Sequence, residues 1–138
     1  MHSDAVIKNV AVELDLAEDL PPVLGDRVQL QQVLLNLMMN GFDAMEGVPI
    51  PERILVIRTA QEAGSLVRVS VRDAGVGFDG QDVEELFAPF KTTKAKGLGM
   101  GLAINRSIVE AHGGKIWAER NADRGATFHF TLPVDTSA

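Results

Sequence analysis

Three short segments of this 138-residue chain combine residue types that could hold a charged ligand. Residues 36–40 carry two asparagines, residues 73–77 carry an aspartate beside two glycines, and residues 97–102 carry three glycines. Amide and carboxylate oxygens suit a hard cation, and a glycine-rich helix start suits an anion. Each segment is a weak signal alone, and together they form a binding site only if the fold brings them to one place.

The first segment belongs to a polar stripe on a predicted helix. Gln29, Gln32, Asn36, Asn40 and Asp43 are spaced by three or four residues and so share one face. A face turned to bulk water usually carries Lys, Glu and Arg, whereas this one is mostly amides. The stripe could satisfy neighbouring loop backbone, or Asn40 could offer its carbonyl oxygen to Mg²⁺.

The second segment closes a predicted strand. An aspartate followed by glycines is often only a turn. A buried Asp73 carboxylate would, however, accept a hydrogen bond from the exocyclic amine of adenine, whereas guanine would present a second acceptor there. Gly75 and Gly77 would let the backbone approach the flat base closely.

The third segment leads directly into a predicted helix. Glycines at a helix start leave main-chain N–H groups free to face an anion, favoured there by the helix dipole. The segment lacks the Lys-Ser/Thr ending of a P-loop and does not follow a first strand as a Rossmann loop does. Lys91, Lys94 and Lys96 add local positive charge beside it. Flexible linkage is the alternative, and the three segments together favour a pocket for ATP and a metal ion.

Hydrophobic periodicity predicts the elements that must position these segments. We expect strands near residues 10–17, 53–60, 66–73, 115–120 and 126–132, and helices near 26–45, 81–86 and 100–111. Asp26 and Gln29 predict a capping box at the first long helix. The strands alternate, so one sheet face should carry the helices and the core, which gives a two-layer α/β sandwich. Residues 1–5 and 134–138 are expected to be loose ends, and residues 88–99 show no periodicity.

Composition narrows the classes of function. The formal net charge of −6 disfavours nucleic-acid binding, and the absence of cysteine excludes disulfides and Cys-ligated zinc. No apolar run is long enough to cross a bilayer. We expect one cytoplasmic, monomeric domain over residues 1–138, with its core at about 10–133.

At this point the chain resembles the ATP-binding catalytic domains of sensor histidine kinases, within the group that includes type II topoisomerase, mismatch-repair and chaperone ATPases. Residues 36–40 resemble the N box, 73–77 the first glycine box, 86–94 the F box and 97–102 the second glycine box. The resemblance implies a Bergerat fold with a mixed, mostly antiparallel sheet. The motif variants in residues 92–94 and 99–101 are most similar to the oxygen-sensing and nitrogen-regulating subgroup.

The resemblance also implies roles for individual residues. Asp73 would hold the adenine amine, and Asn40, with Asn36 nearby, would hold Mg²⁺ and phosphates. Phe87 and Phe90 would pack the base of the lid and face partner helices. The other implied ATP-binding residues are Thr92, Thr93 and Lys94 at the triphosphate and the lid segment Gly97, Leu98, Gly99, Met100, Gly101 and Leu102.

Two positions depart from the family pattern. Many relatives carry a basic residue where this chain has Asp43, so Lys94 is expected to make that phosphate contact, or Asp43 to join the metal shell through water. A threonine often follows the glycine before the last strand, where this chain has Ala126. We expect fewer contacts to adenine on that side, and Thr127 is not obviously equivalent to the threonine of the relatives.

The resemblance points to phosphoryl transfer rather than hydrolysis. ATPase relatives use a glutamate at the position of Asn36 to activate water, and an amide has no useful basicity. His2, His112 and His129 are each poor candidates for the phosphoacceptor, so the acceptor would lie on a dimerisation hairpin outside this chain, with a response regulator downstream. The alternatives are an anti-sigma-factor-type serine kinase and a nucleotide-binding regulatory domain without catalysis.

Overall fold

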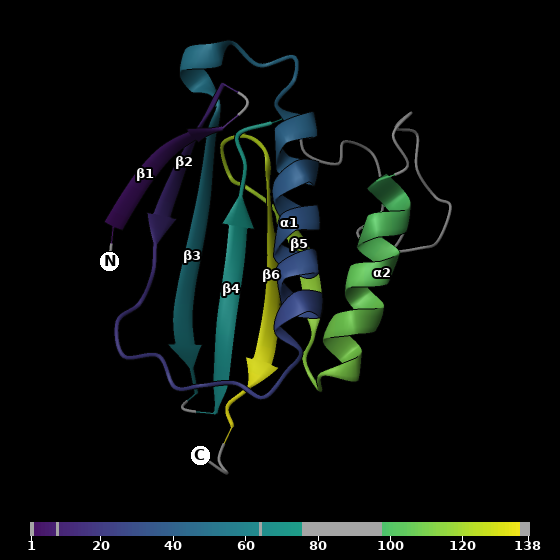
Figure 1. Ribbon diagram of the computed structural model, residues 1–138. Coiled ribbons are helices and arrows are strands. Elements are labelled where there is room, and N and C mark those ends of the chain that lie inside the picture. The colour runs from purple at the N-terminus through teal and green to yellow at the C-terminus, as the bar shows by residue number, and fades with distance from the viewer. Residues whose placement is uncertain (1, 8, 64, 76–97, 136–138) are drawn as a thin grey trace.

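The computed structural model describes residues 2–7, 9–63, 65–75 and 98–135. Within this part, one six-stranded sheet has the order β1-β2-β3-β4-β6-β5, and both α-helices cover the same face (Figure 1). β2 and β3 are parallel, and every other neighbouring pair is antiparallel. The elements are β1 (His2–Ile7), β2 (Val10–Asp15), α1 (Arg27–Ala44), η1 (Ile50–Glu52), β3 (Ile54–Glu62), β4 (Leu66–Arg72), α2 (Leu98–Ala111), β5 (Ile116–Arg120) and β6 (Ala126–Pro133). The predicted two-layer α/β sandwich with a mixed, mostly antiparallel sheet is confirmed.

Alternation along the strands sorts the side chains between the two faces of the sheet. In β4, Val67 and Val71 are buried under the helices, whereas Arg72 is exposed. β6 follows the same rule, with Phe128 and Phe130 buried and His129 on the opposite face. Strands β2 to β6 therefore form where the sequence predicted them, with bounds shifted by one or two residues.

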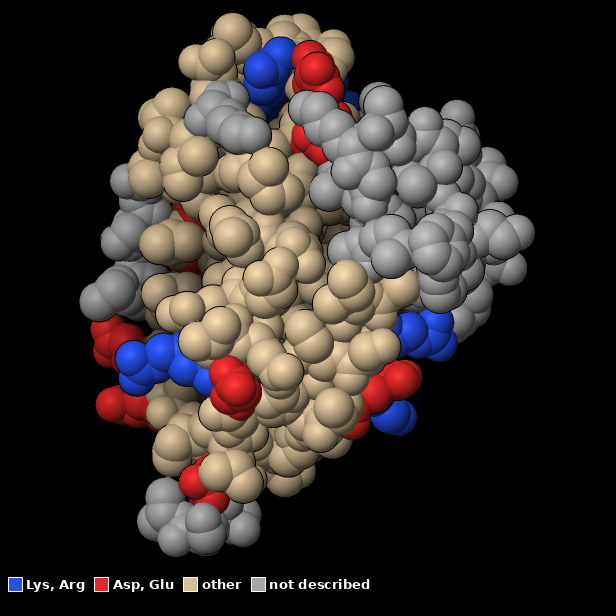
Figure 2. Space-filling view, turned by 45° about the vertical axis from the view of Figure 1, so that its right-hand side comes forward, with Lys and Arg blue, Asp and Glu red and all other residues tan. Residues whose placement is uncertain are grey.

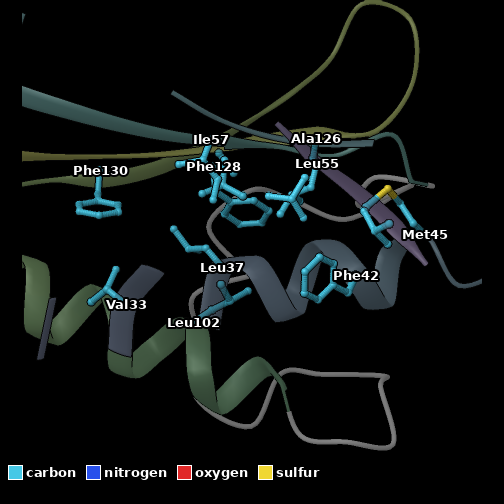
Figure 3. Packing of buried hydrophobic residues seen from close by; sticks show 14 of the residues in the cluster. Val33, Leu37, Phe42, Met45, Leu55, Ile57, Leu102, Ala126, Phe128 and Phe130 are labelled. Carbon is cyan, nitrogen blue, oxygen red and sulfur yellow. The ribbon is translucent and has the colours of Figure 1, made fainter. Parts of the chain in front are cut away.

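The core lies between the sheet and the two helices. Figure 3 shows side chains of α1 and α2 pointing toward side chains of the sheet. Its labelled members are Val33, Leu37, Phe42 and Met45 from α1 and its C-terminal cap, Leu102 from α2, and Leu55, Ile57, Ala126, Phe128 and Phe130 from the sheet. Each fully buried Leu or Phe contributes about 1.5–3 kcal/mol, so this layer fixes α1 and α2 against β4 and β6.

The start of α1 is capped as the sequence predicted, with one difference. Asp26 Oδ1 accepts hydrogen bonds from the amides of Val28 (2.9 Å) and Gln29 (3.2 Å). The reciprocal half of the predicted capping box is wrong, because the Asp26 amide donates to Nε2 of His112 at 3.0 Å. A partner 86 residues away replaced the expected local one.

Through this hydrogen bond, His112 connects the end of α2 to the start of α1. It follows α2, and its Nδ1 lies 2.8 Å from the carbonyl oxygen of Ile108, so Nδ1–H donates there and Nε2 accepts from Asp26. His112 therefore caps a carbonyl in the last turn of α2. Gly113 then turns the chain with a φ of +81°, the left-handed conformation that glycine commonly adopts after a helix.

The ends of the chain are more ordered than expected. Residues 2–7 form β1, which pairs antiparallel along β2, and Asn9 makes the intervening turn with a φ of +62°. The prediction of a loose N-terminal end was therefore wrong, because strand pairing supplies the order that the local pattern lacks. At the other end, the amides of Val134 and Asp135 donate to the carbonyls of Ser65 and Pro22, so these two residues are held against the rest of the domain, while residues 136–138 lie outside the described part. No helix among the described residues is long and apolar enough to span a bilayer.

Candidate nucleotide-binding site

Three element ends lie at the same end of the sandwich (Figure 1). They are the C-terminal end of β4, the C-terminal half of α1 and the N-terminal end of α2, which runs antiparallel to α1. These ends carry Asp73, the polar stripe with Asn36 and Asn40, and the glycine-containing start of α2. The fold therefore gathers the described parts of the three segments that the sequence singled out.

Asp73 is buried and held by the main chain. Its side chain is in a residue only 3% exposed, and Oδ1 accepts hydrogen bonds from the amides of Gly75 (2.9 Å) and Ala126 (3.2 Å). Its own amide donates to the carbonyl of Ala126, which extends the β4–β6 ladder by one residue. Two N–H donors on one oxygen stabilise a carboxylate, and they fix its orientation before any ligand binds.

Two glycines allow this close packing around Asp73. A Cβ at Gly125, whose φ is +86°, would lie 2.2 Å from the Asp73 carbonyl oxygen and 2.8 Å from Oδ1. A Cβ at Gly75 would lie 2.4 Å from the carbonyl oxygen of Ala44 at the end of α1. Any other residue would push the β5–β6 turn or the end of α1 away from the carboxylate.

The other carboxylate oxygen of Asp73 lies on the α1 side. A Cβ built at Gly41 would be 3.5 Å from Asp73 Cβ and 3.9 Å from Oδ2. Gly41 follows Asn40 directly, and Asn40 is itself only 7% exposed. The carboxylate therefore lies against α1 at Gly41, the residue that follows the second asparagine of the stripe.

The amides of α1 form a hydrogen-bonded row. Gln32 Nε2 donates to Asn36 Oδ1 at 3.3 Å, and Asn36 Nδ2 donates to Asn105 Oδ1 on α2 at 3.0 Å. Asp43 lies one turn beyond Asn40 and is partly exposed. Figure 2 shows a broad uncharged surface on the helix side, with Lys, Arg, Asp and Glu mostly around its rim. Two members of the predicted amide stripe, Gln32 and Asn36, are thus hydrogen-bonded to each other, and Asn36 also contacts the second helix.

Most of the predicted lid and F-box residues, and the second glycine of the first glycine box, fall outside the described residues. These positions are Gly77, Phe87, Phe90, Thr92, Thr93, Lys94 and Gly97. The backbone of Leu98, Gly99, Met100 and Gly101 forms the first turn of α2. Leu102 is 5% exposed and packs in the core beside α1 (Figure 3), which gives it a packing role.

Sequence reasoning missed two amides near this site. Asn121 Nδ2 donates to the carbonyls of Asp73 and Arg124, each at 3.0 Å, and its Oδ1 accepts from the Thr127 hydroxyl. The Thr127 hydroxyl is therefore hydrogen-bonded within the β5–β6 turn, whereas the main-chain amide of Ala126 donates to the Asp73 carboxylate. Asn105 left a signal in the sequence, because it interrupts the apolar spacing of Leu102 and Val109 on α2.

A hard cation would find amide oxygens here rather than a cluster of acids. Among the described residues, no group of three or more His, Cys, Asp or Glu side chains could hold a metal ion. The Asn40 side chain suits a site that takes its remaining ligands from water and phosphate, as Mg²⁺ sites commonly do. The residues present therefore fit a metal that arrives with a nucleotide.

Sequence comparison places this geometry in a known family. Residues 25–136 match the model of the histidine kinase-, DNA gyrase B- and HSP90-like ATPases. The chain is 48% identical over 127 residues to sensor protein FixL of Bradyrhizobium diazoefficiens and 41% identical over 127 residues to sensor protein TdiS of Thauera aromatica. These matches take in 92% and 91% of this chain but only 25% and 23% of the relatives, so the chain spans about a quarter of their length. The match to FixL is consistent with the subgroup that the motifs resemble.

Solved structures of histidine kinases support the same family assignment. The catalytic domain of histidine kinase ThkA, in a nucleotide-free form, superposes with a TM-score of 0.74 at 36% identity, over 88% of this chain and 76% of that one. Full-length ShkA in complex with AMPPNP gives a TM-score of 0.75 at 31% identity, over 92% of this chain and 26% of that one. The chain therefore belongs to the histidine kinase-, DNA gyrase B- and HSP90-like ATPase family and, within it, is an ATP-binding catalytic domain of the sensor histidine kinase type.

Proposed function

We propose that this domain binds ATP together with Mg²⁺ and transfers the γ-phosphoryl group to a histidine on a helical dimerisation domain of the same kinase. The observation that carries the proposal is the buried Asp73 carboxylate, oriented by two main-chain amides at the end of β4. A second support is the position of this carboxylate beside the Asn40 end of α1.

Asp73 would select adenine. Its Oδ1 is engaged by the amides of Gly75 and Ala126, so the carboxylate cannot rotate freely, and Oδ2 lies toward α1. A carboxylate only accepts hydrogen bonds, so it would attract the 6-amino group of adenine and repel the 6-carbonyl of guanine. Gly75 and Gly77 would border the base.

The α1 amides would hold the phosphate end of the nucleotide. Asn40 would offer its amide oxygen to Mg²⁺, and Asn36 would lie beside it at the triphosphate. Bound Mg²⁺ would neutralise phosphate charge, which is the chemistry that it supplies in phosphoryl transfer. Thr92, Thr93, Lys94 and the start of α2 would complete the phosphate contacts, and Asp43 would join the metal shell through water.

The acceptor histidine would come from outside this chain. In the transfer, an acceptor ring nitrogen forms a bond to the γ-phosphorus while the bond from that phosphorus to the β–γ bridging oxygen breaks, which leaves ADP. His112 has both ring nitrogens in hydrogen bonds, and the side chain of His129 is only 12% exposed, which supports excluding them as acceptors. Phe87 and Phe90 would face the partner helices, and a response regulator would receive the phosphoryl group.

Two alternatives make different predictions. An anti-sigma-factor-type kinase would phosphorylate serine, and a regulatory domain would bind nucleotide without transfer. Relatives of this chain carry the names of sensor proteins and histidine kinases, which favours transfer to histidine.

The test is reconstitution of the transfer. The domain is mixed with Mg-ATP and a separately made helical hairpin from the same kinase. We expect acid-labile phosphate on the hairpin and very little ATP turnover by the domain alone. Acid-stable phosphoserine on a sigma-pathway partner would support the anti-sigma type, and nucleotide binding without transfer would support the regulatory domain.

A further inference from the structure

We propose that Asn105 is a positioning residue that fixes the side chain of Asn36 and so links α2 to the phosphate-facing stripe of α1. The inference deepens the proposed function and rests on it for the role of Asn36 in nucleotide binding. The contact itself stands on the geometry of the two helices.

Asn105 is a buried polar residue with both ends of its amide satisfied. It is 0% exposed and lies on the face of α2 that packs against α1. Its Nδ2 donates to the main-chain carbonyl of Val33 at 3.3 Å, and its Oδ1 accepts from Asn36 Nδ2 at 3.0 Å. Both partners belong to α1, one helical turn apart.

The Val33 carbonyl determines which group donates and which accepts in each hydrogen bond from Gln32 through Asn36 to Asn105. A carbonyl oxygen can only accept, so the NH₂ group of Asn105 must face it and the oxygen of Asn105 must face Asn36. Asn36 then has to turn its own NH₂ group toward Asn105, which leaves its oxygen on the side of Gln32. Asn36 is therefore held in one of its two amide orientations by a residue on the other helix.

The position of α2 gives this contact a consequence. α2 begins at Leu98, inside the glycine segment, and Asn105 lies seven residues further on, two turns along the same helix. The hydrogen bond from Asn36 to Asn105 therefore connects this helix, two turns beyond its start, to the polar face of α1.

The test substitutes Asn105→Leu, which keeps the approximate volume and removes both hydrogen bonds. Val109→Ala is the matched control, since Val109 is equally buried on α2 and belongs to the apolar core. Affinity for ATP with and without Mg²⁺ is measured for both variants, for Asn36→Ala and for the Asn36→Ala/Asn105→Leu pair, with melting temperatures as a measure of stability.

We expect Asn105→Leu to weaken Mg-ATP binding by about three- to tenfold, the range that one or two net hydrogen bonds support. The same substitution should have no further effect once Asn36 is alanine. An equal loss in the Asn36→Ala background, unchanged affinity in Asn105→Leu, or an equal loss in Val109→Ala at a matched melting temperature would each overturn the proposal.

A readout without nucleotide separates this inference from the proposed function. The side-chain NH₂ protons of Asn36, followed by NMR, should exchange slowly in the wild type and in Val109→Ala but quickly in Asn105→Leu. If the wild type does not bind ATP, the proposed function fails and the Asn36–Asn105 tie is then judged by the exchange rates. Equal exchange rates in the wild type and Asn105→Leu would refute the tie itself.

Discussion

The side chain of His129 on β6 is partly buried on the face of the sheet that the helices do not cover, and it forms a hydrogen bond there. Its Nδ1 lies 2.7 Å from the Ser70 hydroxyl, and its ring stacks on Trp117 with centroids 5.1 Å apart. Nε2 lies 3.7 Å from a carboxylate oxygen of Glu119, which is too far for a hydrogen bond. Burial lowers the pKa of His129 below its ordinary value of 6.5, and Glu119 offsets this only in part.

This lowered pKa predicts how the stability of the domain depends on pH. The folded state favours the neutral ring, so the contribution is complete above the unfolded pKa of about 6.5 and is lost as pH falls through the folded pKa. His129→Asn keeps a group that can bond Ser70 but cannot take up a proton in this range. Between about pH 8 and pH 5.5, the wild type should lose more of its melting temperature than His129→Asn. Parallel curves for the two proteins would contradict the assignment.

At the scale of elements, the end of α1 packs directly on the residues that follow β4. The contact depends on the missing side chain of Gly75, because a Cβ there would meet the main chain of Ala44. Gly41 of α1 similarly approaches Leu55 of β3. The distance between the α1 amides and the Asp73 carboxylate is therefore set by small residues in the helix–sheet contact.

Gly75→Ala should destabilise the domain by about 1–3 kcal/mol, as overpacking of a close contact does. The obstacle is backbone and cannot rotate away, since the nearest atoms are the carbonyl of Ala44 at 2.4 Å and 2.6 Å. Gly47→Ala, which meets nothing within 4 Å, is the control and should change stability by less than about 1 kcal/mol. Chemical denaturation measures both, and equal effects would show that the α1–β4 contact tolerates a side chain.

The elements of the sandwich were predictable where local patterns determine them. The period-two pattern of β4 and β6 and the Asp26 cap of α1 appear in the structure as expected. β1 was missed because its order comes from pairing with β2, and the partner of the Asp26 amide was missed because His112 is distant in sequence. Local periodicity carries no information about either contact.

At the scale of the whole molecule, the sheet order determines which segments meet. β4 lies beside β6, so the Asp73 carboxylate accepts a hydrogen bond from the amide of Ala126. α1 packs on β3 and β4, which brings Gly41, the residue after Asn40, to the carboxylate. The sequence named Asp73, Asn36 and Asn40 by residue type, and the family resemblance gave them an order in space. Neither the residue types nor the resemblance indicated a role for Asn105, because its hydrogen-bond partners lie on the opposite helix, far away in the sequence.

The most direct test of this account is calorimetric titration of the wild type and Asp73→Asn with ATP, ADP and GTP, with and without Mg²⁺. Asparagine can still accept the two main-chain N–H bonds through its oxygen, but it presents a donor where Oδ2 was. We expect the wild type to prefer adenine nucleotides, and Asp73→Asn to lose at least about tenfold in ATP affinity while its ATP-over-GTP preference shrinks. Equal affinity of the wild type for ATP and GTP, or unchanged ATP affinity in Asp73→Asn, would contradict the adenine site at Asp73.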